Sequence, residues 1–517
     1  MSDTPKIENK ENSPSPSASP TPSTNMAPSQ SPKTPSFKKN YLFNLIVQVL
    51  TYLIPLITSP YLSRVLTPTG IGTNSFANSI ANYFTLIIAF GYLTYGTKEV
   101  SRLHESKKEY SVVFWNIVFS RLFLFVLAFP TYFLMAYLWG FGSSIDKNVF
   151  LIYSLTLVST LLTITFLFQG LENFKTISLI TISVKIVAAV FYFLLVKEPD
   201  DLFIYIAIYV SANAAIALLS WIFALRKVER PHFKDIHIFR SLRSNISYFL
   251  PTIAISVYTM LDHTMLGYLS TTEEVGYYEE AYKVISVVTG LVSAISPVIL
   301  ARISALIQEG NEAEVEHKIV QVGELYALIA FPSFFGIYAI ASYFIPAFFG
   351  ESYVPSVQVL YWLIPLVVII PISSIIGNAY YVPRDKIKMT TWFLLAGAVV
   401  NFTTNFFAIH YMAAQGAAIT SLIAESIISL LYVLFSFKKM PYKKNIKTFL
   451  KPAIAAVLMF VVLMLLNTFV LDPYVTKNVY KTLIDIGVGV VIYGSLCILL
   501  KEPFVRSALR RVFKKKA

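Results

Sequence analysis

Residues 203–225 read FIYIAIYVSANAAIALLSWIFAL, an apolar run without a charged side chain. As an α-helix, such a run is about 35 Å long, enough to cross the roughly 30 Å hydrocarbon core of a bilayer. Backbone N–H and C=O groups find no water inside a bilayer, so a spanning segment must satisfy them internally, as a helix does. Runs of this kind recur along the chain. We therefore predict an all-α, polytopic membrane protein.

The composition agrees with this prediction. Of the 517 residues, 56% are hydrophobic and 14% are charged, and the mean hydropathy is +0.63. These values exclude a water-soluble domain of mixed helix and sheet. We place about fourteen spans, at 41–66, 73–96, 112–139, 148–168, 175–196, 203–225, 247–269, 280–303, 321–348, 356–379, 389–411, 416–436, 449–471 and 480–500.

Alternate connections between these runs are strongly basic. The basic ones carry Lys98, Arg102, Lys107 and Lys108; Arg226, Lys227, Arg230, Lys234, Arg240 and Arg243; Arg384, Lys386 and Lys388; and Lys438, Lys439, Lys443, Lys444 and Lys447. The intervening ones nearly lack Lys and Arg, as in TPTG (67–70), STTEEVG (270–276), GESYVPS (350–356) and YMAAQG (411–416). The positive-inside rule places the basic connections in the cytoplasm. The basic end, 501–517, then places both termini in the cytoplasm and requires an even number of spans.

The chain begins with a segment of different composition. Residues 1–40 are rich in Pro, Ser and Thr and nearly lack aliphatic side chains. Such a segment cannot bury enough surface to offset its ordering entropy, so we predict a disordered cytoplasmic tail.

Two short segments resemble each other and indicate an internal repeat. LTPTGIGTNSFA (66–77) and LSTTEEVGYYEEA (269–281) share an aliphatic residue followed by Gly, at Gly72 and Gly276, with Ala77 and Ala281 beyond. Both follow a run that leads outward, so the repeats would be parallel, with a cavity between them. The alternative is a chance match, since outward turns favour small residues.

The sequence lacks the common motifs of nucleotide hydrolysis, zinc peptidase and hydrolase chemistry. No GxxxxGK[ST], HExxH or GxSxG occurs, and the single cysteine, Cys497, lies inside an apolar run. We therefore expect no enzyme activity, disulfide, metal cluster or cofactor, although H⁺ or Na⁺ could act as a coupling ion. The net charge of +13 lies in the connections, where it sets topology, so we expect no nucleic-acid partner.

Ionisable residues inside the apolar runs are the candidates for function. They are Arg64, Arg121, Lys185, Asp262, Lys283, Arg302 and Glu425. Each costs at least about 2.5 kcal/mol at bilayer depth, so it should face the interior or a wet cavity. Snorkelling to the interface is an equal alternative for Arg64, Lys283 and Arg302. If the basic members converge, they would attract an anion such as a pyrophosphate.

The remaining candidates suit other roles. Asp262 lies deep in its run, and we expect it to face the cavity, while Glu425 could bind a cation or pair with a basic residue. Asn401 and Asn405, at i and i+4, share one helix face, and such pairs bond a neighbouring helix more often than a ligand.

Several segments together resemble a known family. They are TSPYLSRVLTPTGIGTNSFANSIANYFTLIIAFGYLTYGTKEVSR (58–102), FLFQGLENF (166–174), LDHTMLGYLSTTEEVGYYEEAYKV (261–284), LARISAL (300–306), and the series Asn401, Asn405, Gly416, Ala417, Ala418 and Glu425. The chain after residue 40 resembles the Wzx-type polysaccharide repeat-unit flippases, within the multidrug/oligosaccharidyl-lipid/polysaccharide exporter superfamily. It departs from the family at Thr67 and Ala413, where Gly is usual, at Lys98, where Arg is usual, and at Ala301, where Pro often stands.

The resemblance implies two six-helix lobes around a central cavity. We accordingly expect a tail at 1–40, lobes at 41–226 and 247–436 joined by a cytoplasmic loop at 227–246, accessory helices at 437–500, and a basic tail at 501–517. It marks Gln169, Gly170 and Glu172 as motif residues. Arg64, Arg121, Lys185, Lys283 and Arg302 would bind the pyrophosphate, while Asp262 and Glu425 would bind a coupling ion or balance charge.

The implied function is transport of an undecaprenyl-pyrophosphate-linked oligosaccharide across the plasma membrane by alternating access, for capsule or exopolysaccharide synthesis. Membrane lipids and a polysaccharide polymerase would be partners. Alternatives are a cation-coupled drug exporter and an exporter of lipid II or a teichoic-acid precursor. A polytopic enzyme, such as a polymerase or acyltransferase, is a further alternative, which the short outward connections disfavour.

Overall fold

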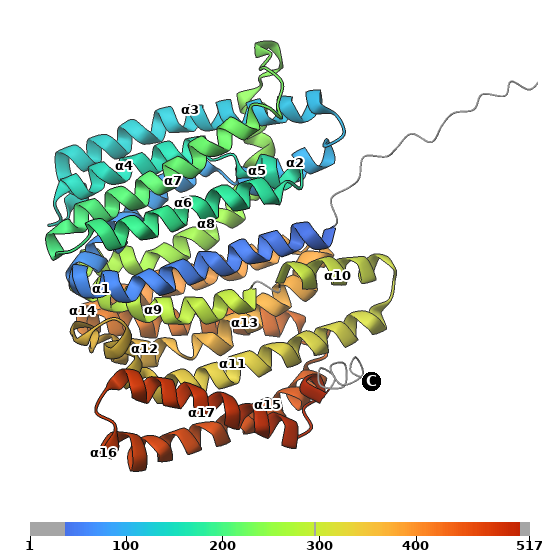
Figure 1. Cartoon of the computed structure of the whole chain (residues 1–517). Coiled ribbons are helices and arrows are strands. Elements are labelled where there is room, and N and C mark those ends of the chain that lie inside the picture. Colours follow the sequence, from blue (N-terminus) through green and yellow to red (C-terminus); the bar gives the residue numbers. More distant parts are fainter. Residues whose placement is uncertain (1–36, 294–295, 507–517) are drawn as a thin grey trace, which may run out of the picture.

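The computed structural model describes residues 37–293 and 296–506, and every regular element in these ranges is helical (Figure 1). The side chains of 37–53, 251, 254, 255, 257, 258, 292, 293, 296–298, 301, 443 and 445 are left undescribed. The prediction of an all-α protein is confirmed for these ranges. The predicted tails lie largely outside them, at 1–36 and 507–517.

The elements follow the chain as a series of long helices with short connections. The first half comprises α1 (Phe37–Ala89), α2 (Tyr92–Arg102), α3 (Lys107–Trp139), η1 (Gly140–Gly142), α4 (Lys147–Leu162), α5 (Thr165–Gly170), α6 (Phe174–Leu195), η2 (Pro199–Asp201), α7 (Leu202–Ala224), η3 (Phe233–Asp235) and α8 (Ile238–Leu269). The second half comprises α9 (Thr272–Ser293), α10 (Ser296–Gln308), α11 (Glu312–Phe348), η4 (Glu351–Tyr353), α12 (Ser356–Leu363), α13 (Leu366–Ile376), η5 (Gly377–Tyr381), η6 (Val382–Arg384), α14 (Ile387–Ser436), α15 (Tyr442–Leu466), η7 (Asn467–Leu471), α16 (Asp472–Tyr474) and α17 (Asn478–Leu499).

Ten helical segments in the described ranges are long and apolar enough to cross a membrane. The chain is therefore a multi-pass membrane protein. One of these segments begins at Ile54 inside α1, another is α14, and each of these two elements joins two helices at a kink. The count of fourteen spans stays a prediction.

Each kink lies at a non-glycine residue with positive φ. Thr67 has φ 63° and ψ 169° and precedes Pro68, while Ala413 has φ 47° and ψ −125°. Residues with a side chain strongly disfavour these φ and ψ angles, which glycine adopts readily. The preference of the resembled family for glycine at these two positions therefore has a conformational reason.

Some element boundaries differ from those predicted. The helix predicted at 280–303 begins earlier than expected, because α9 starts at Thr272. We set its start too late because acidic residues interrupt the apolar pattern, yet Glu273 and Glu274 occupy the first turn of α9, where the helix dipole favours negative charge. Helix α8 begins at Ile238 rather than 247, and α1 at Phe37 rather than 41.

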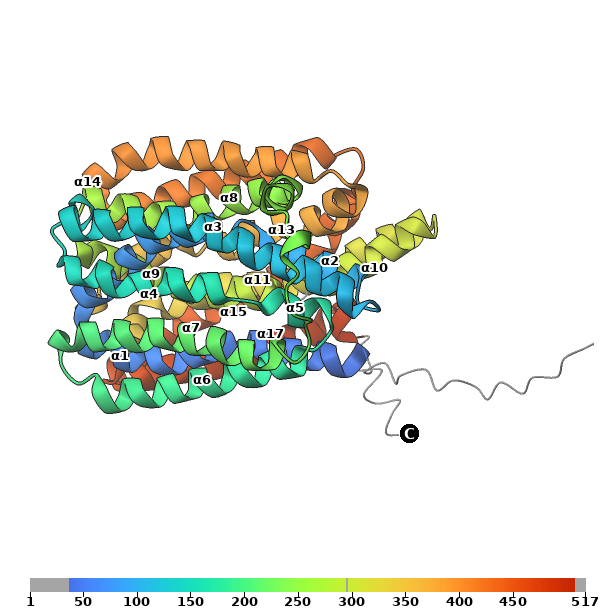
Figure 2. The ribbon, with the colours of Figure 1, turned by 90° about the horizontal axis from the view of Figure 1, so that it is seen from above.

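The helices run roughly side by side, with α1 in the middle of the bundle (Figure 1). Helix α1 packs on α4 and α6 on one side and on α8 and α9 on the other. Seen from above, α14, α8 and α3 follow one edge, and α10 extends beyond the end of the bundle (Figure 2). Helices α15 and α17 pack on each other and on α11. The lobe boundaries predicted from the sequence stay a prediction.

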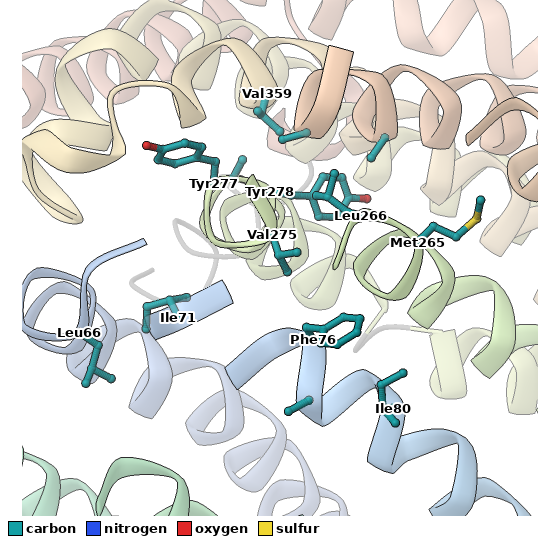
Figure 3. Packing of buried hydrophobic residues seen from close by; sticks show 14 of the residues in the cluster. Leu66, Ile71, Phe76, Ile80, Met265, Leu266, Val275, Tyr277, Tyr278 and Val359 are labelled. Carbon is teal, nitrogen blue, oxygen red and sulfur yellow. The ribbon is translucent and has the colours of Figure 1, made fainter. Parts of the chain in front are cut away.

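The apolar core joins segments that are 200 residues apart in sequence. Figure 3 shows Ile71 and Phe76 of α1 facing Val275 of α9 and Leu266 of α8, and all four side chains are at most 3% exposed. Helices α1, α8 and α9 therefore form one continuous core rather than separate bodies.

Candidate functional site

A buried polar network joins α8, α9 and α14 around Asp262. Its carboxylate accepts hydrogen bonds from Asn401 Nδ2 at 3.0 Å and Asn405 Nδ2 at 2.7 Å. It also accepts from the Tyr278 hydroxyl at 2.7 Å and from the Ser421 hydroxyl. Four donors on two neighbouring helices therefore hold one carboxylate, which suits a charge kept away from lipid.

The network continues along α14. Asn405 Nδ2 lies 3.1 Å from Asn401 Oδ1, and the Thr420 hydroxyl donates to Asn405 Oδ1. Asn401 and Asn405 are fully buried. One carboxylate among amide and hydroxyl oxygens is the kind of ligand set that hard cations prefer. Among the described residues, no group of three or more His, Cys, Asp or Glu side chains is arranged for a metal ion.

A second polar cluster lies between α1 and α9 and centres on Glu280, which is fully buried. Its carboxylate accepts from Ser63 Oγ at 2.8 Å and from Ser59 Oγ at 3.3 Å. Lys283 Nζ donates to the same carboxylate at 2.9 Å. The positive charge that we expected Lys283 to offer a ligand is thus shared with a carboxylate one helical turn away.

Glu279 extends this cluster toward α8. It lies 2.7 Å from His263 Nε2, accepts from Ser75 Oγ at 2.9 Å, and has Lys283 Nζ at 3.7 Å. Sequence reasoning missed both Glu279 and Glu280. Their spacing of three and four residues from Lys283 was the available signal, because such residues share a helix face.

A cavity lies beside this cluster between α1, α9 and α11. It has a volume of about 320 Å³. Lys283, Ser59 and Ser286 supply its polar groups, and the rest of the lining is largely aliphatic and aromatic: Pro55, Leu56, Val284, Val287, Val288, Ile337, Ile340, Phe344, Phe348 and Phe349. The cavity therefore combines a cationic side chain with a long apolar wall.

The other predicted cations lie on four separate helices. Arg121 of α3 is 3% exposed and donates to the carbonyl oxygen of Thr163, the C-cap of α4. Arg64 of α1 is exposed and donates to the carbonyl oxygen of Ala347. Lys185 is half-buried on α6, and Arg302 is exposed on α10. Arg121 therefore stabilises the break between α4 and α5, where the helix dipole favours a cation.

The remaining predicted residues have local roles. Glu425 is half-buried on α14, one turn beyond Ser421. Gln169 accepts a hydrogen bond from Thr97 of α2 at 3.2 Å, and a Cβ on Gly170 would lie 2.6 Å from Val100. This motif therefore packs α5 closely on α2. Glu172 is exposed and has φ 53°.

Burial changes the balance of charge that the sequence suggested. Five of the seven ionisable residues that we predicted inside the apolar runs are basic. Among the described residues, the buried acidic side chains are Asp262, Glu280, Glu324, Asp485 and Glu502, whereas the buried Lys and Arg side chains are Arg121 and Lys481. Within the described residues, buried acidic side chains therefore outnumber buried basic ones.

Segments of the two predicted lobes, 41–226 and 247–436, touch at both ends of the bundle. At one end, Gly72 of α1 packs against the start of α9 at Thr272. At the other end, the rings of Phe90 and Phe249 lie 4.0 Å apart, and Lys98 Nζ donates to the Tyr248 hydroxyl at 3.0 Å. The region between the two contacts holds both polar clusters.

Residues 37–306 match the sequence profile of a family described as "Polysaccharide biosynthesis protein". The chain belongs to this family. Two relatives named "Putative O-antigen transporter" are similar to it: the protein of Escherichia coli (strain K12), 25% identical over 77% of this chain and 96% of its own length, and that of Shigella dysenteriae, 27% identical over 78% and 99%. "Teichuronic acid biosynthesis protein TuaB" of Bacillus subtilis (strain 168) is 22% identical over 52% of this chain and 55% of its own.

Solved structures support the fold of this family member. The lipid II flippase MurJ, in an inward closed conformation, superposes with a TM-score of 0.72 at 18% identity over 90% of this chain and 99% of its own. An inward-facing multidrug transporter of the MATE family superposes with a TM-score of 0.56 at 13% identity, over 77% of this chain and 94% of its own. The predicted resemblance is therefore confirmed for the family, by the sequence profile, and for the fold, by the solved structures.

Proposed function

We propose that the protein is a flippase that moves an undecaprenyl-pyrophosphate-linked oligosaccharide from the inner to the outer leaflet of the plasma membrane. The family match and the relatives named as O-antigen transporters support transport of a polysaccharide precursor. Capsule or exopolysaccharide synthesis would use the product. The protein acts as a transporter and not as an enzyme in this proposal.

The cavity between α1, α9 and α11 is the observation that carries the proposal. A lipid-linked sugar has an anionic pyrophosphate between a polar glycan and a long apolar tail. The cavity offers Lys283 and Ser59 beside a wall that includes Phe344 and Phe348. In this proposal the cavity opens laterally, so that the tail stays in lipid while the pyrophosphate reaches the polar cluster.

Contacts at both ends of the bundle support alternating access. The substrate can enter only if the contact of Phe90 and Lys98 with α8 breaks. It can leave only if Gly72 separates from α9. We propose that the basic connections mark the cytoplasmic end, so that the α2–α8 contact closes the inner side and both termini are cytoplasmic.

Asp262 is our proposed site for a coupling cation, with Glu425 balancing charge nearby. The amide and hydroxyl groups around Asp262 can turn their oxygens toward Na⁺, or the carboxylate can take up H⁺. Because the network ties α8 and α9 to α14, ion binding there would change how these helices pack.

The pyrophosphate would meet cations on several helices. We propose Lys283 as the first contact, because it lines the cavity, with Arg64, Lys185 and Arg302 contacting the moving substrate. Changing Lys185 and Arg302 together to Ala should abolish glycan export at normal membrane insertion. Wild-type export by this variant would refute their role.

A leaflet assay tests the function directly. The purified protein is reconstituted into vesicles that contain a fluorescent undecaprenyl-pyrophosphate oligosaccharide, and a membrane-impermeant quencher reports the outer leaflet. We expect protein-dependent exchange that is lost in Lys283→Met/Glu280→Gln, which removes the cation while leaving the net charge of the cluster unchanged. The Asp472→Asn variant, altered at a side chain outside this cavity, is the matched control.

The same vesicles separate the alternatives. Exchange of labelled lipid II but not of the oligosaccharide would assign the peptidoglycan precursor instead. Uptake of a cationic dye without lipid exchange would assign drug export. Absence of any protein-dependent exchange by a folded, reconstituted protein would contradict the proposal.

A further inference from the structure

Asp485 is a buried carboxyl group that the transport site does not use. It lies on α17, which packs with α15 against α11, away from the α1–α9 interface. Its exposed fraction is 0%, and neither carboxyl oxygen has a hydrogen-bond partner within the described residues. This is unlike Asp262, whose carboxylate accepts four hydrogen bonds.

The surroundings of Asp485 are apolar. It borders a cavity of about 790 Å³ between α11, α15 and α17. Asp485 is the one charged residue among those that line the cavity; its neighbours there include Ile340, Leu463, Ile486 and Gly489. An ionised carboxylate without partners in such a place costs many times more than a neutral one, so the group takes up a proton instead.

A lysine is placed to change the balance between the protonated and the ionised form of Asp485. Lys481 lies four residues before Asp485, so the two side chains share one face of α17. In this structure, Lys481 Nζ donates instead to Asp472 Oδ1 at 2.8 Å, and the Tyr343 hydroxyl donates to the same oxygen at 2.7 Å. Asp472 is half-exposed, whereas Lys481 is largely buried.

Other polar groups on the packed elements are uncharged or distant. Asn467 of η7 lies near Asp485, but its Nδ2 donates to the carbonyl oxygen of Ala339 at 3.3 Å. Other titratable groups of these elements include Tyr343 and Glu324 on α11, Lys451 on α15, whose Nζ donates to the carbonyl oxygen of Lys501, Tyr493 and Cys497 on α17, and Glu502 beyond it. Cys497 is three turns beyond Asp485, about 18 Å along the helix axis. Lys481 and Asp472 therefore dominate the electrostatic environment of Asp485.

We propose that Asp485 is a proton-binding site of the accessory helices, whose occupancy decides where Lys481 is bonded. With the proton bound, Asp485 is a neutral acid, and Lys481 pairs with Asp472. When the proton passes to water, the O–H bond of Asp485 breaks, and Lys481 turns from Asp472 to the new carboxylate. Asp472 is then free to be hydrated at the exposed end. This site is separate from the proposed coupling site at Asp262 and does not rest on the transport function.

Infrared spectroscopy of the full-length protein in lipid tests the proposal without a transport assay. We expect a carbonyl band of a protonated carboxyl group at neutral pH that is missing in Asp485→Asn. Asn is close in shape to the neutral acid, so this variant should fold, which its melting temperature checks. Asp485→Glu should keep such a band. Wild-type and Asp485→Asn spectra that coincide in the band region of protonated carboxyl groups at neutral pH would show an ionised Asp485 and overturn the proposal.

Two variants test the role of Lys481. Lys481→Met removes the cation that stabilises ionised Asp485, so its band should persist to higher pH. Asp472→Asn removes the competing anion, so the band should vanish at lower pH. A tenfold change in proton affinity corresponds to one pH unit in the midpoint. If both variants leave the midpoint unchanged, Lys481 does not exchange between the two carboxyl groups and the coupling is refuted.

Discussion

Gly72 and Gly276, which hold equivalent positions in the two repeats, pack against each other's helices at one end of the bundle. A Cβ atom on Gly72 would lie 1.6 Å from the carbonyl oxygen of Thr272 and 2.7 Å from the amide nitrogen of Gly276. A Cβ on Gly276 would lie 2.1 Å from the carbonyl oxygen of Pro68. The backbones of α1 and α9 therefore meet without side chains between them, as small residues allow in membranes.

Ala at Gly72 or Gly276 should force this end apart. Overpacking of this kind costs about 3 kcal/mol, at the upper end of the usual range, which shifts a two-state equilibrium more than a hundredfold. A cysteine at Ser79, which is buried and bonds Thr264, reports the opening in a Cys497→Ser background. We expect faster maleimide labelling from outside and a lower melting temperature.

Gly487→Ala is the matched control, because nothing lies within 4 Å of a Cβ at that position. It should label at the wild-type rate and melt at the wild-type temperature or slightly above, since Ala favours helix over Gly. Equal labelling of the Gly72→Ala and control proteins would show that the α1–α9 contact does not close the outer end.

Replacing Thr67 or Ala413 by Gly should stabilise the protein. Both residues have positive φ at a kink, and such backbone costs a non-glycine residue about 1 kcal/mol or more. Each variant should raise the melting temperature, and the double variant should raise it further, because the kinks lie on α1 and α14. The control Ala396→Gly, at an exposed position inside the regular first part of α14, should lower it by the usual cost of Gly, about 1 kcal/mol.

The sequence predicted the helices and some of their shared faces, but not which helices lie opposite one another. Apolar runs predicted the helices because helix formation in lipid depends on local composition. The repeat pointed to Gly72 and Gly276, and the i, i+4 spacing of Asn401 and Asn405 predicted a shared face. What the spacing could not tell was which helix lies opposite that face, so Asp262 and Asn401 remained separate candidates.

The charged residues were harder to interpret for the same reason. A sequence shows that Lys283 has Glu279 and Glu280 one turn away, but it does not show that Ser59 and Ser63, over 200 residues earlier, complete the cluster. Arg121 had the pattern of a ligand-binding cation, yet its partner is a backbone carbonyl group at the end of α4. Tertiary contacts, rather than local pattern, decide these roles.

Lys283→Met should destabilise the protein strongly on its own. It leaves Glu280 buried without its cation, and loss of one partner of a buried ion pair costs about 3–5 kcal/mol. Adding Glu280→Gln should restore much of the stability, because the amide is neutral and still accepts from Ser63. The melting temperatures of the four proteins form a double-mutant cycle. Additive effects would mean that the 2.9 Å contact contributes no net stability.

Binding of a cation at Asp262 should appear as ion-dependent stability. A ligand that binds only the folded state at a hundred times its Kd adds about 2.7 kcal/mol. We expect NaCl to raise the melting temperature of the wild type relative to choline chloride at equal ionic strength. Asp262→Asn should abolish this gain, because the amide supplies no charge to the cation. Asp472→Asn, altered at a half-exposed carboxylate on α16, should retain the gain. A wild-type protein that responds to neither Na⁺ nor pH would contradict coupling at Asp262, and the four hydrogen bonds would then serve only to hold α8 and α9 against α14.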